Sequence, residues 1–247
     1  LQSLTGYRTF EQVNNVDLDS VPELIIQVPG ELKELDQFSQ EIRLSSKQNG
    51  GLDLDGRLAW LIAGYYGKST SDGTLPLTAF GSTTTQSQVF KRESWAVFTH
   101  IDFDILDSLT LNVGARCSED RIDHAFSLRQ PGTGKIPTPY DEKAKFDNTS
   151  FEGGVQYRID PNKMVYFRYA EGYRGGTFVG LPASLDATAL VQPEISTSYE
   201  VGLKSDWLDG ALRVNLTLFD VKYKNLQRDI VFKGADNTFI QATANAA

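Results

Sequence analysis

The chain has 247 residues, of which 40% are hydrophobic and 23% are charged, and its formal net charge is −8. This acidic balance argues against nucleic acid as a partner, because nucleic-acid binding needs a clustered basic surface. No run in the sequence approaches the roughly 18 apolar residues that a transmembrane helix requires. The single cysteine, Cys117, excludes an intramolecular disulfide.

Aromatic and β-branched residues recur in segments of about ten to thirteen residues, and clusters of Gly, Pro, Asn and Asp separate these segments. This pattern is typical of strands and lacks the periodicity of long amphipathic helices. In chain order it predicts strands over residues 3–13, 37–46, 57–68, 92–103, 109–121, 148–159, 163–174, 196–206 and 211–224, with a tenth strand starting near Gln227.

The connections between the predicted strands alternate in length. The short connections cover residues 48–56, 104–108, 160–162 and 207–210. The long connections, of roughly twenty residues each, cover residues 14–36, 69–91, 122–147 and 175–195. An up-and-down membrane barrel needs this alternation, because its short periplasmic turns lie at one end and its long extracellular loops lie at the other.

Several predicted strands alternate between an apolar face and a polar face. In residues 109–118 the odd positions are apolar, whereas the even positions include Asn112 and Arg116. A face that carries such residues suits the wet interior of a barrel whose apolar face contacts lipid. A soluble antiparallel sheet with one solvated face would alternate too, and it is the alternative interpretation. The residues expected to contact lipid include Leu111, Val113, Val214 and Leu216.

Two polar residues share parity with the apolar face. Gln40 aligns with Phe38 and Ile42, and Glu171 aligns with Phe167 and Tyr169. Both lie near the expected outer end of their strands, where a polar side chain costs little.

The sequence contains no pattern that supports catalysis or a resident cofactor. Gly67-Lys68-Ser69 looks like the end of a phosphate-binding loop, but Ile62 stands where that motif requires its first glycine. His100 and His124 are the only histidines, and neither has a neighbour at metal-ligand spacing. The chain is therefore not expected to be an enzyme or to hold a metal.

Several segments resemble the barrel of TonB-dependent receptors of the bacterial outer membrane. Residues 38–46 read FSQEIRLSS, similar to the family strand sQElRLsS, and residues 163–178 read KMVYFRYAEGYRGGTF, similar to lYasyarGyrsGgfn. Residues 192–206 read QPEISTSYEVGLKSD, which resembles pEtvtsYElGlKsd. These segments follow the family order and, with the strands between them, cover most of residues 37–230. Cys117 departs from the family, which usually has an aromatic residue there.

The resemblance implies an all-β fold, in which residues 1–247 form an antiparallel up-and-down transmembrane segment of about nine or ten strands within a 22-stranded barrel. Neither a plug domain nor a TonB-box segment is visible, and the end of the sequence lacks a closing aromatic strand. We therefore expect an N-terminal part of the barrel. Because an open sheet edge is costly in lipid, the first and last strands are expected to pair with strands outside this sequence.

By the same resemblance, the parent protein imports a scarce solute across the outer membrane. Siderophore-bound iron is the commonest cargo of the family, and energy comes through the TonB complex, which contacts parts outside this chain. The implied partners are outer-membrane lipid, TonB and a small-molecule ligand such as a metal chelate. The alternatives are a passive porin-like or structural barrel and a soluble glycan-binding β domain.

Four arginines with inward parity are the candidate ligand-binding residues: Arg43, Arg116, Arg168 and Arg174. Arginine forms bidentate pairs with carboxylates and phosphates, so it suits an anionic ligand. The simpler alternative is that these arginines pair with acidic groups of the barrel wall or of a plug. Arg174 lies nearest the expected outer mouth and is the residue expected to receive the ligand.

Overall fold

The computed structural model describes residues 1–17, 26–47, 50–79, 81–129, 140–178, 190–233 and 239–246. Within these ranges there is no helix long and apolar enough to cross a membrane. The strands, in chain order, are β1 Gln2–Asp17, β2 Ile26–Ser45, β3 Leu58–Ala79, β4 Ser82–Leu106, β5 Leu109–Arg129, β6 Tyr140–Asp160, β7 Lys163–Arg174, β8 Thr177–Phe178, β9 Leu190–Val191, β10 Glu194–Trp207, β11 Leu212–Lys224, β12 Leu226–Lys233 and β13 Phe239–Ala246.

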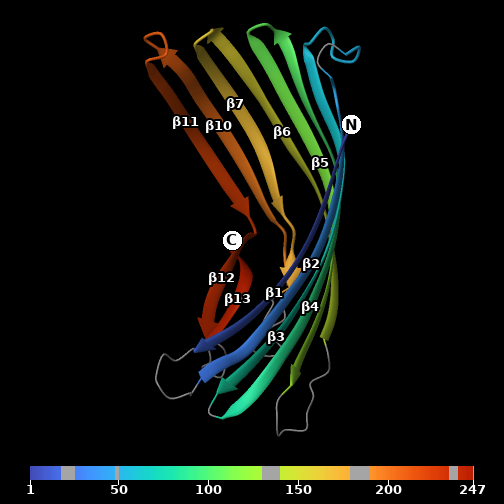
Figure 1. The fold of residues 1–247 in the computed structure, drawn as a ribbon. Helices are drawn as coiled ribbons and strands as arrows, with labels where there is room; N and C mark the ends of the chain where they lie inside the picture. The colour runs from blue at the N-terminus through green and yellow to red at the C-terminus, as the bar shows by residue number, and fades with distance from the viewer. Residues whose placement is uncertain are drawn as a thin grey trace.

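Nine of these strands form one curved antiparallel sheet in the order β1-β2-β3-β4-β5-β6-β7-β10-β11 (Figure 1). Neighbours along the chain are therefore neighbours in the sheet, apart from the separate β8–β9 pair that comes between β7 and β10. The predicted all-β, up-and-down architecture is confirmed. Within the described part of the chain, β1 and β11 are the two edges of this sheet and do not pair with each other, as expected.

The tenth strand predicted near Gln227 exists as β12, but it does not join the nine-stranded sheet. It pairs with β13 in a separate hairpin. Asn225, between β11 and β12, has a φ of 54°. A left-handed residue breaks the extended backbone, so the chain changes direction there instead of continuing the ladder.

The four short connections lie together at one end of the sheet, at the top of Figure 1. Two of them contain the same tripeptide, Leu-Asp-Gly, in the same left-handed conformation. In Leu208-Asp209-Gly210 the φ angles are 54°, 53° and 88°, and the Gly210 amide donates to the Trp207 carbonyl at 3.2 Å. Residues 54–56 repeat the pattern with φ angles of 49°, 59° and 84°. Glycine and aspartate accept this conformation readily, whereas leucine does so at a steric cost.

At the opposite end, the described parts of three of the four predicted long loops, over 14–36, 69–91 and 122–147, are strand, which corrects the predicted boundaries. Residues 18–25 and 130–139 lie outside the described part of the chain. In the connection expected over 69–91, β3 continues to Ala79 and β4 begins at Ser82, with Gly81 at a φ of 76°. Threonine and serine dominate these extensions, and the hydroxyls of Thr78 and Thr83 bond across the pair at 2.8 Å. Outside the lipid neither face of a strand has to be apolar, so the sequence no longer alternates between apolar and polar residues. The hydrogen-bonded pairing of the two strands nevertheless continues.

The strands consequently differ in height. β1–β6 continue well beyond the ends of β7, β10 and β11 (Figure 1). The connection expected over 175–195 contains the short β8 and β9, while residues 179–189 lie outside the described part of the chain.

The sheet has one uncovered apolar face, which we call the outer face. The four residues predicted to contact lipid all lie on it, with exposed fractions of 38% for Leu111, 41% for Val113, 42% for Val214 and 57% for Leu216. Apolar side chains left this open in a folded protein indicate contact with a membrane. The placement of these residues on one face agrees with the parity assigned from the sequence.

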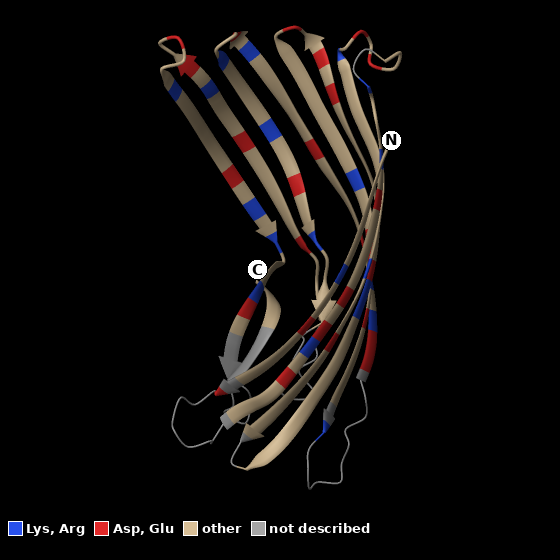
Figure 2. Cartoon of the chain, in the orientation of Figure 1, with Lys and Arg blue, Asp and Glu red and all other residues tan. Residues whose placement is uncertain are grey.

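Beyond this apolar band the outer face becomes ionic. Lys145 lies 2.8 Å and Arg121 lies 2.7 Å from the Glu119 carboxylate, on β6 and β5 respectively. Charged residues of both signs continue along the extended strands (Figure 2). Trp95, which is the cross-strand partner of Glu119, marks the change, as expected for an aromatic residue at headgroup level.

The two polar exceptions on the outer face both have partners. Gln40 accepts a hydrogen bond from Thr5 Oγ1 at 2.6 Å on the neighbouring strand. The Glu171 carboxylate accepts one from the Phe151 amide at 2.9 Å. Each bond gives a hydrogen-bond partner to a polar side chain that lies on the otherwise apolar face.

Candidate functional site

The inner face carries the four candidate arginines, but the structure does not gather them into one site. Residues that are partners on successive strands form a cross-strand row, and Arg43 and Arg116 share one row through Ala63 and Phe98. Arg168 lies further toward the short-turn end, in the row of Gly154 and Asn112. Arg174 lies at the opposite end of β7.

Arg43 and Arg116 are held by neighbours on the wall. The Arg43 guanidinium is paired with Glu41, two residues away on its own strand. Arg116 lies over the Phe98 ring, with the guanidinium carbon 5.0 Å from the ring centroid, and its Nε donates to Ser118 Oγ at 3.1 Å. Cation–π stacking of this kind orients the guanidinium against the wall and leaves less of it free for a ligand.

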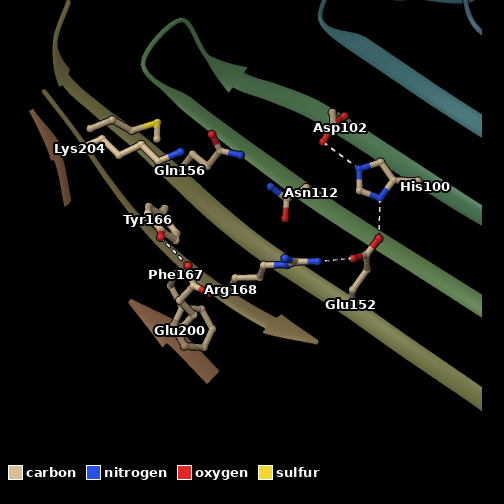
Figure 3. A pocket seen from close by; sticks show the side chains of 11 residues that line it. His100, Asp102, Asn112, Glu152, Gln156, Tyr166, Phe167, Arg168, Glu200 and Lys204 are labelled. Carbon is tan, nitrogen blue, oxygen red and sulfur yellow. Dashed lines mark hydrogen bonds and ion pairs between the residues drawn. The ribbon is translucent and has the colours of Figure 1, made fainter. Parts of the chain in front are cut away.

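Arg168 belongs to a polar network that the sequence did not reveal. Its guanidinium donates to Glu152 Oε2 at 3.2 Å, and the other oxygen of Glu152 lies 2.8 Å from His100 Nδ1 (Figure 3). The second ring nitrogen of His100 lies 3.2 Å from Asp102. The network therefore joins β4, β6 and β7 across the inner wall.

A second polar group adjoins this network on β7 and β10. The Tyr166 hydroxyl donates to Glu200 and lies 3.2 Å from Thr217 Oγ1 on β11. The Lys204 ammonium lies 5.6 Å from the centroid of the Tyr166 ring. Together the two groups line an open pocket of ≈ 380 Å³ (Figure 3). Cations and carboxylates alternate along this wall, so most of its charge is already balanced.

The pocket residues do not form a metal centre. Among the described residues, no group of three or more His, Cys, Asp and Glu side chains is placed to hold a metal ion. The network can instead line a water-filled passage, in which paired charges keep the wall polar without fixing a cation.

The end of β7 separates from β6 and leans over the inner face, while it stays paired with β10 as far as Arg174. Pairing between β6 and β7 stops at Glu152 and Ala170. Tyr173 has outward parity, yet its hydroxyl donates to Asp120 Oδ2 at 3.0 Å on the inner face of β5. This reversal places the Tyr173 side against the wall, and Arg174 on the opposite side is exposed. Arg174 makes no ion pair with any residue that the structure describes.

The segment after β7 is anchored close to the wall. Arg92 Nη2 donates to the Gly176 carbonyl at 3.1 Å. A side chain at Gly176 would place its Cβ 2.3 Å from the Phe146 ring and 2.6 Å from the Val191 carbonyl. Only glycine permits so close an approach. Burial and the charge of Asp120 raise the pKa of Tyr173, so its hydroxyl stays protonated as the donor of this anchor.

The β8–β9 pair then covers a small apolar cluster on the inner wall. The cluster consists of Ile122, Phe146 and Phe178, with Phe90 and Ala144 packed against it. His124 lies beside the cluster and is fully buried, with an exposed fraction of 0%. Burial lowers the pKa of His124 and raises the pKa of Glu142, its cross-strand partner.

An antiparallel sheet with an uncovered apolar outer face, an ionic margin and a polar inner wall defines the class of this protein as an outer-membrane β-barrel. The family model described as "TonB dependent receptor-like, beta-barrel" matches residues 1–246. The chain therefore belongs to this family, as its sequence segments predicted. Membership of a receptor family also agrees with the expectation that the chain is not an enzyme.

Curated relatives include two receptors from Pseudomonas. The chain is 29% identical over 141 residues to the ferric-pyoverdine 358 receptor of Pseudomonas putida, which covers 57% of the chain and 16% of the relative. It is 30% identical over 127 residues to the ferric-pyoverdine M114 receptor of Pseudomonas sp. (strain M114), covering 51% and 14% respectively. The matches thus span less than one fifth of each relative.

Solved receptor structures share the fold. The ferric yersiniabactin uptake receptor FyuA of Yersinia pestis superposes with a TM-score of 0.79 at 15% identity, covering 91% of this chain and 33% of that one. The siderophore receptor PiuA of Acinetobacter baumannii gives a TM-score of 0.58 at 16% identity, covering 87% and 35%. At this identity the likeness concerns the fold, and it supports the barrel wall assigned above.

Proposed function

We propose that the chain forms part of the wall of a receptor that imports a ferric chelate of the siderophore class, with energy supplied through TonB. The family match over residues 1–246 carries this proposal. The names of the two curated relatives, both ferric-pyoverdine receptors, favour iron as the cargo. We propose further that residues 1–247 are a partial barrel domain completed by strands of the longer protein.

A ferric chelate receptor and a passive porin make different predictions for the purified protein. The receptor should bind ferric pyoverdine saturably and should prefer it to the iron-free chelator. In liposomes it should not let small sugars pass freely, whereas a porin would cause swelling in proportion to sugar concentration. Swelling without saturable binding would favour the porin alternative. The family match removes the soluble glycan-binding alternative.

Arg174 is the residue of this chain that we propose for contact with an anionic ligand. It is exposed at the end of β7, and no ion pair among the described residues involves it. Its register partner on β10, Glu194, accepts a hydrogen bond from the Gln227 amide. By contrast, Arg43 and Arg168 form ion pairs with Glu41 and Glu152. The proposal concerns the first capture of the ligand, because Arg174 lies at the end of the sheet opposite the short turns.

The test compares two exposed arginines. Arg174→Ala should weaken binding of an anionic ferric chelate about tenfold, corresponding to roughly 1.4 kcal/mol. Arg213 is 70% exposed and is paired with Asp206 near a short turn, so Arg213→Ala serves as the control and should leave affinity unchanged. Equal affinities for the two variants, at equal amounts of folded protein, would count against a ligand role for Arg174.

A further inference from the structure

His124 is enclosed between the wall and the β8–β9 pair. Its ring stacks on Phe90 of β4, with centroids 4.1 Å apart and planes 13° from parallel. On its other side lies Phe178 of β8, with centroids 5.6 Å apart and planes 21° from parallel. The exposed fraction is 4% for Phe178, 2% for Val191 of β9 and 0% for His124 itself.

The enclosed imidazole lacks the partners that a buried polar group normally has. Among the residues that the structure describes, neither Nδ1 nor Nε2 of His124 has a hydrogen-bond partner. Buried polar groups are almost always hydrogen-bonded, so an exception calls for a functional explanation. A neutral imidazole tolerates this apolar enclosure far better than the cation, which loses its hydration and finds no acceptor.

We propose that His124 is a proton-sensitive latch: its neutral form holds the β8–β9 pair on the inner wall, and its protonation releases the pair. The proposal concerns access to the barrel interior and does not depend on which solute the receptor carries. It gives the wall a response to the pH of the medium outside the cell, because the site lies beyond the ionic margin of the lipid band.

The charged groups around His124 decide the sign of the response. Glu142 of β6 is its cross-strand partner, Arg92 lies on the same face of β4, and Asp120 lies on the same face of β5. Asp120 is engaged by Ser94 and Tyr173. The described residues of β8 and β9 carry no titratable group. Arg92 opposes a cation at His124, and Glu142 is the only neighbouring carboxylate not engaged by hydrogen bonds in the described structure.

Burial outweighs any attraction between an imidazolium and the two phenyl faces. The pKa of His124 is lowered by desolvation, whereas the pKa of Glu142 is raised by the same cause. The closed state therefore binds fewer protons at His124 than the open state does. Closure is favoured above the ordinary histidine pKa of about 6.5 and is progressively lost as the pH falls below it. The effect of Glu142 has the opposite sign, because its protonation at lower pH favours the closed state.

The β8–β9 pair is the side of the enclosure that should move. β5 is paired with β4 as far as Arg129 and with β6 as far as Phe126. β8 and β9 pair with each other through two residues each. Hydrogen bonds hold the residues on either side of the pair: Arg92 bonds to Gly176 before β8, and Asn245 and Gln227 bond to Gln192 after β9. An uncompensated charge at His124 is therefore relieved at the lowest cost by lifting the pair.

Thiol accessibility of β9 measures this movement in the full-length protein. In a Cys117→Ser background, Val191→Cys places a thiol at a position that is 2% exposed, and Leu190→Cys places one at a neighbouring position that is 41% exposed. The rate of labelling by a water-soluble maleimide is measured for both between pH 7.5 and pH 5. The Val191 to Leu190 rate ratio removes the intrinsic pH dependence of the thiol reaction.

We expect this ratio to rise by up to tenfold for each pH unit below about 6.5. His124→Phe keeps the three-ring stack without a titrating group and should give a flat ratio. His100→Gln removes the other histidine and should keep the rise, and Glu142→Gln should keep it too. A flat ratio with His124 present, or an equal rise in His124→Phe, would overturn the latch.

A second measurement leaves the β9 sequence unaltered. Amide hydrogen exchange at residues 190–191, corrected for the intrinsic effect of pH, should speed up below pH 6.5 in the protein with His124 and not in His124→Phe. The same exchange rates in both proteins at every pH would reject the proposal even if the cysteine variants failed to assemble.

Discussion

A charge placed on the outer face at the centre of the lipid band should be far more costly than the same charge one residue away on the inner face. On β5 the outward apolar run extends from Leu109 to Cys117, with Val113 at its centre. Eight residue steps cover about 27 Å along the strand and about 20 Å across the membrane at a typical tilt. Val113 therefore lies about 10 Å from either surface.

At this depth Val113→Arg should destabilise the barrel by about 2–4 kcal/mol. Leu109→Arg, at the edge of the band, should cost only about 0–1 kcal/mol because the guanidinium reaches the interface. Asn112→Arg points into the lumen beside Asp102 and the pocket of Figure 3, so we expect a cost below about 1 kcal/mol.

Equilibrium unfolding of the protein in phospholipid vesicles, followed by tryptophan fluorescence in guanidinium, measures these differences. Val113→Arg should lower the free energy of unfolding most, and Leu109→Arg and Asn112→Arg should both lower it much less. If Val113→Arg and Asn112→Arg cost the same, the assignment of outer and inner faces is incorrect.

Three further predictions concern the ends of the strands. A protease added to intact cells should cut within residues 130–139 and spare 161–162. Cleavage at 161–162 would show that the short turns, and not the long connections, face the outside of the cell. Gly176→Ala should cost about 1–3 kcal/mol, since its Cβ would lie 2.3 Å from the Phe146 ring, and unchanged stability would show that the segment is not anchored there. Leu208→Gly should raise the free energy of unfolding, measured in guanidinium, by up to about 1 kcal/mol, because glycine relieves the left-handed φ of 54°; a clear loss would contradict this.

The centres of the strands could be predicted from the sequence because lipid and water impose opposite demands on their two faces. The apolar and polar residues around Leu111 and Asn112 alternate for that reason. The short turns could be predicted because they contain Asp and Gly. The extensions of β3 and β4 carry Ser and Thr on both faces, so no alternation marks them. Their strand structure comes from a cross-strand ladder, which a single sequence does not display.

The inner-wall network was missed for a related reason. His100 and Glu152 are 52 residues apart and meet only because the register of β4, β5 and β6 aligns them. Parity alone placed Arg168 on the inner face, but it did not identify Glu152 as its partner. The reversal at Tyr173 was equally hidden, since it requires β7 to separate from β6 after Ala170. Such contacts follow from register and from local breaks in pairing, and neither has a strong local signature.

Energised iron uptake is the direct test of whether this barrel belongs to a TonB-coupled receptor. Cells that lack their own siderophore receptors would express the full-length protein, with and without a functional TonB, and accumulation of radioactive iron from ferric pyoverdine would be followed. We expect both strains to bind the chelate at the surface. Only the strain with TonB should accumulate iron, and collapse of the proton gradient should stop the accumulation. Equal accumulation with and without TonB would contradict the assignment of this barrel to a TonB-coupled receptor.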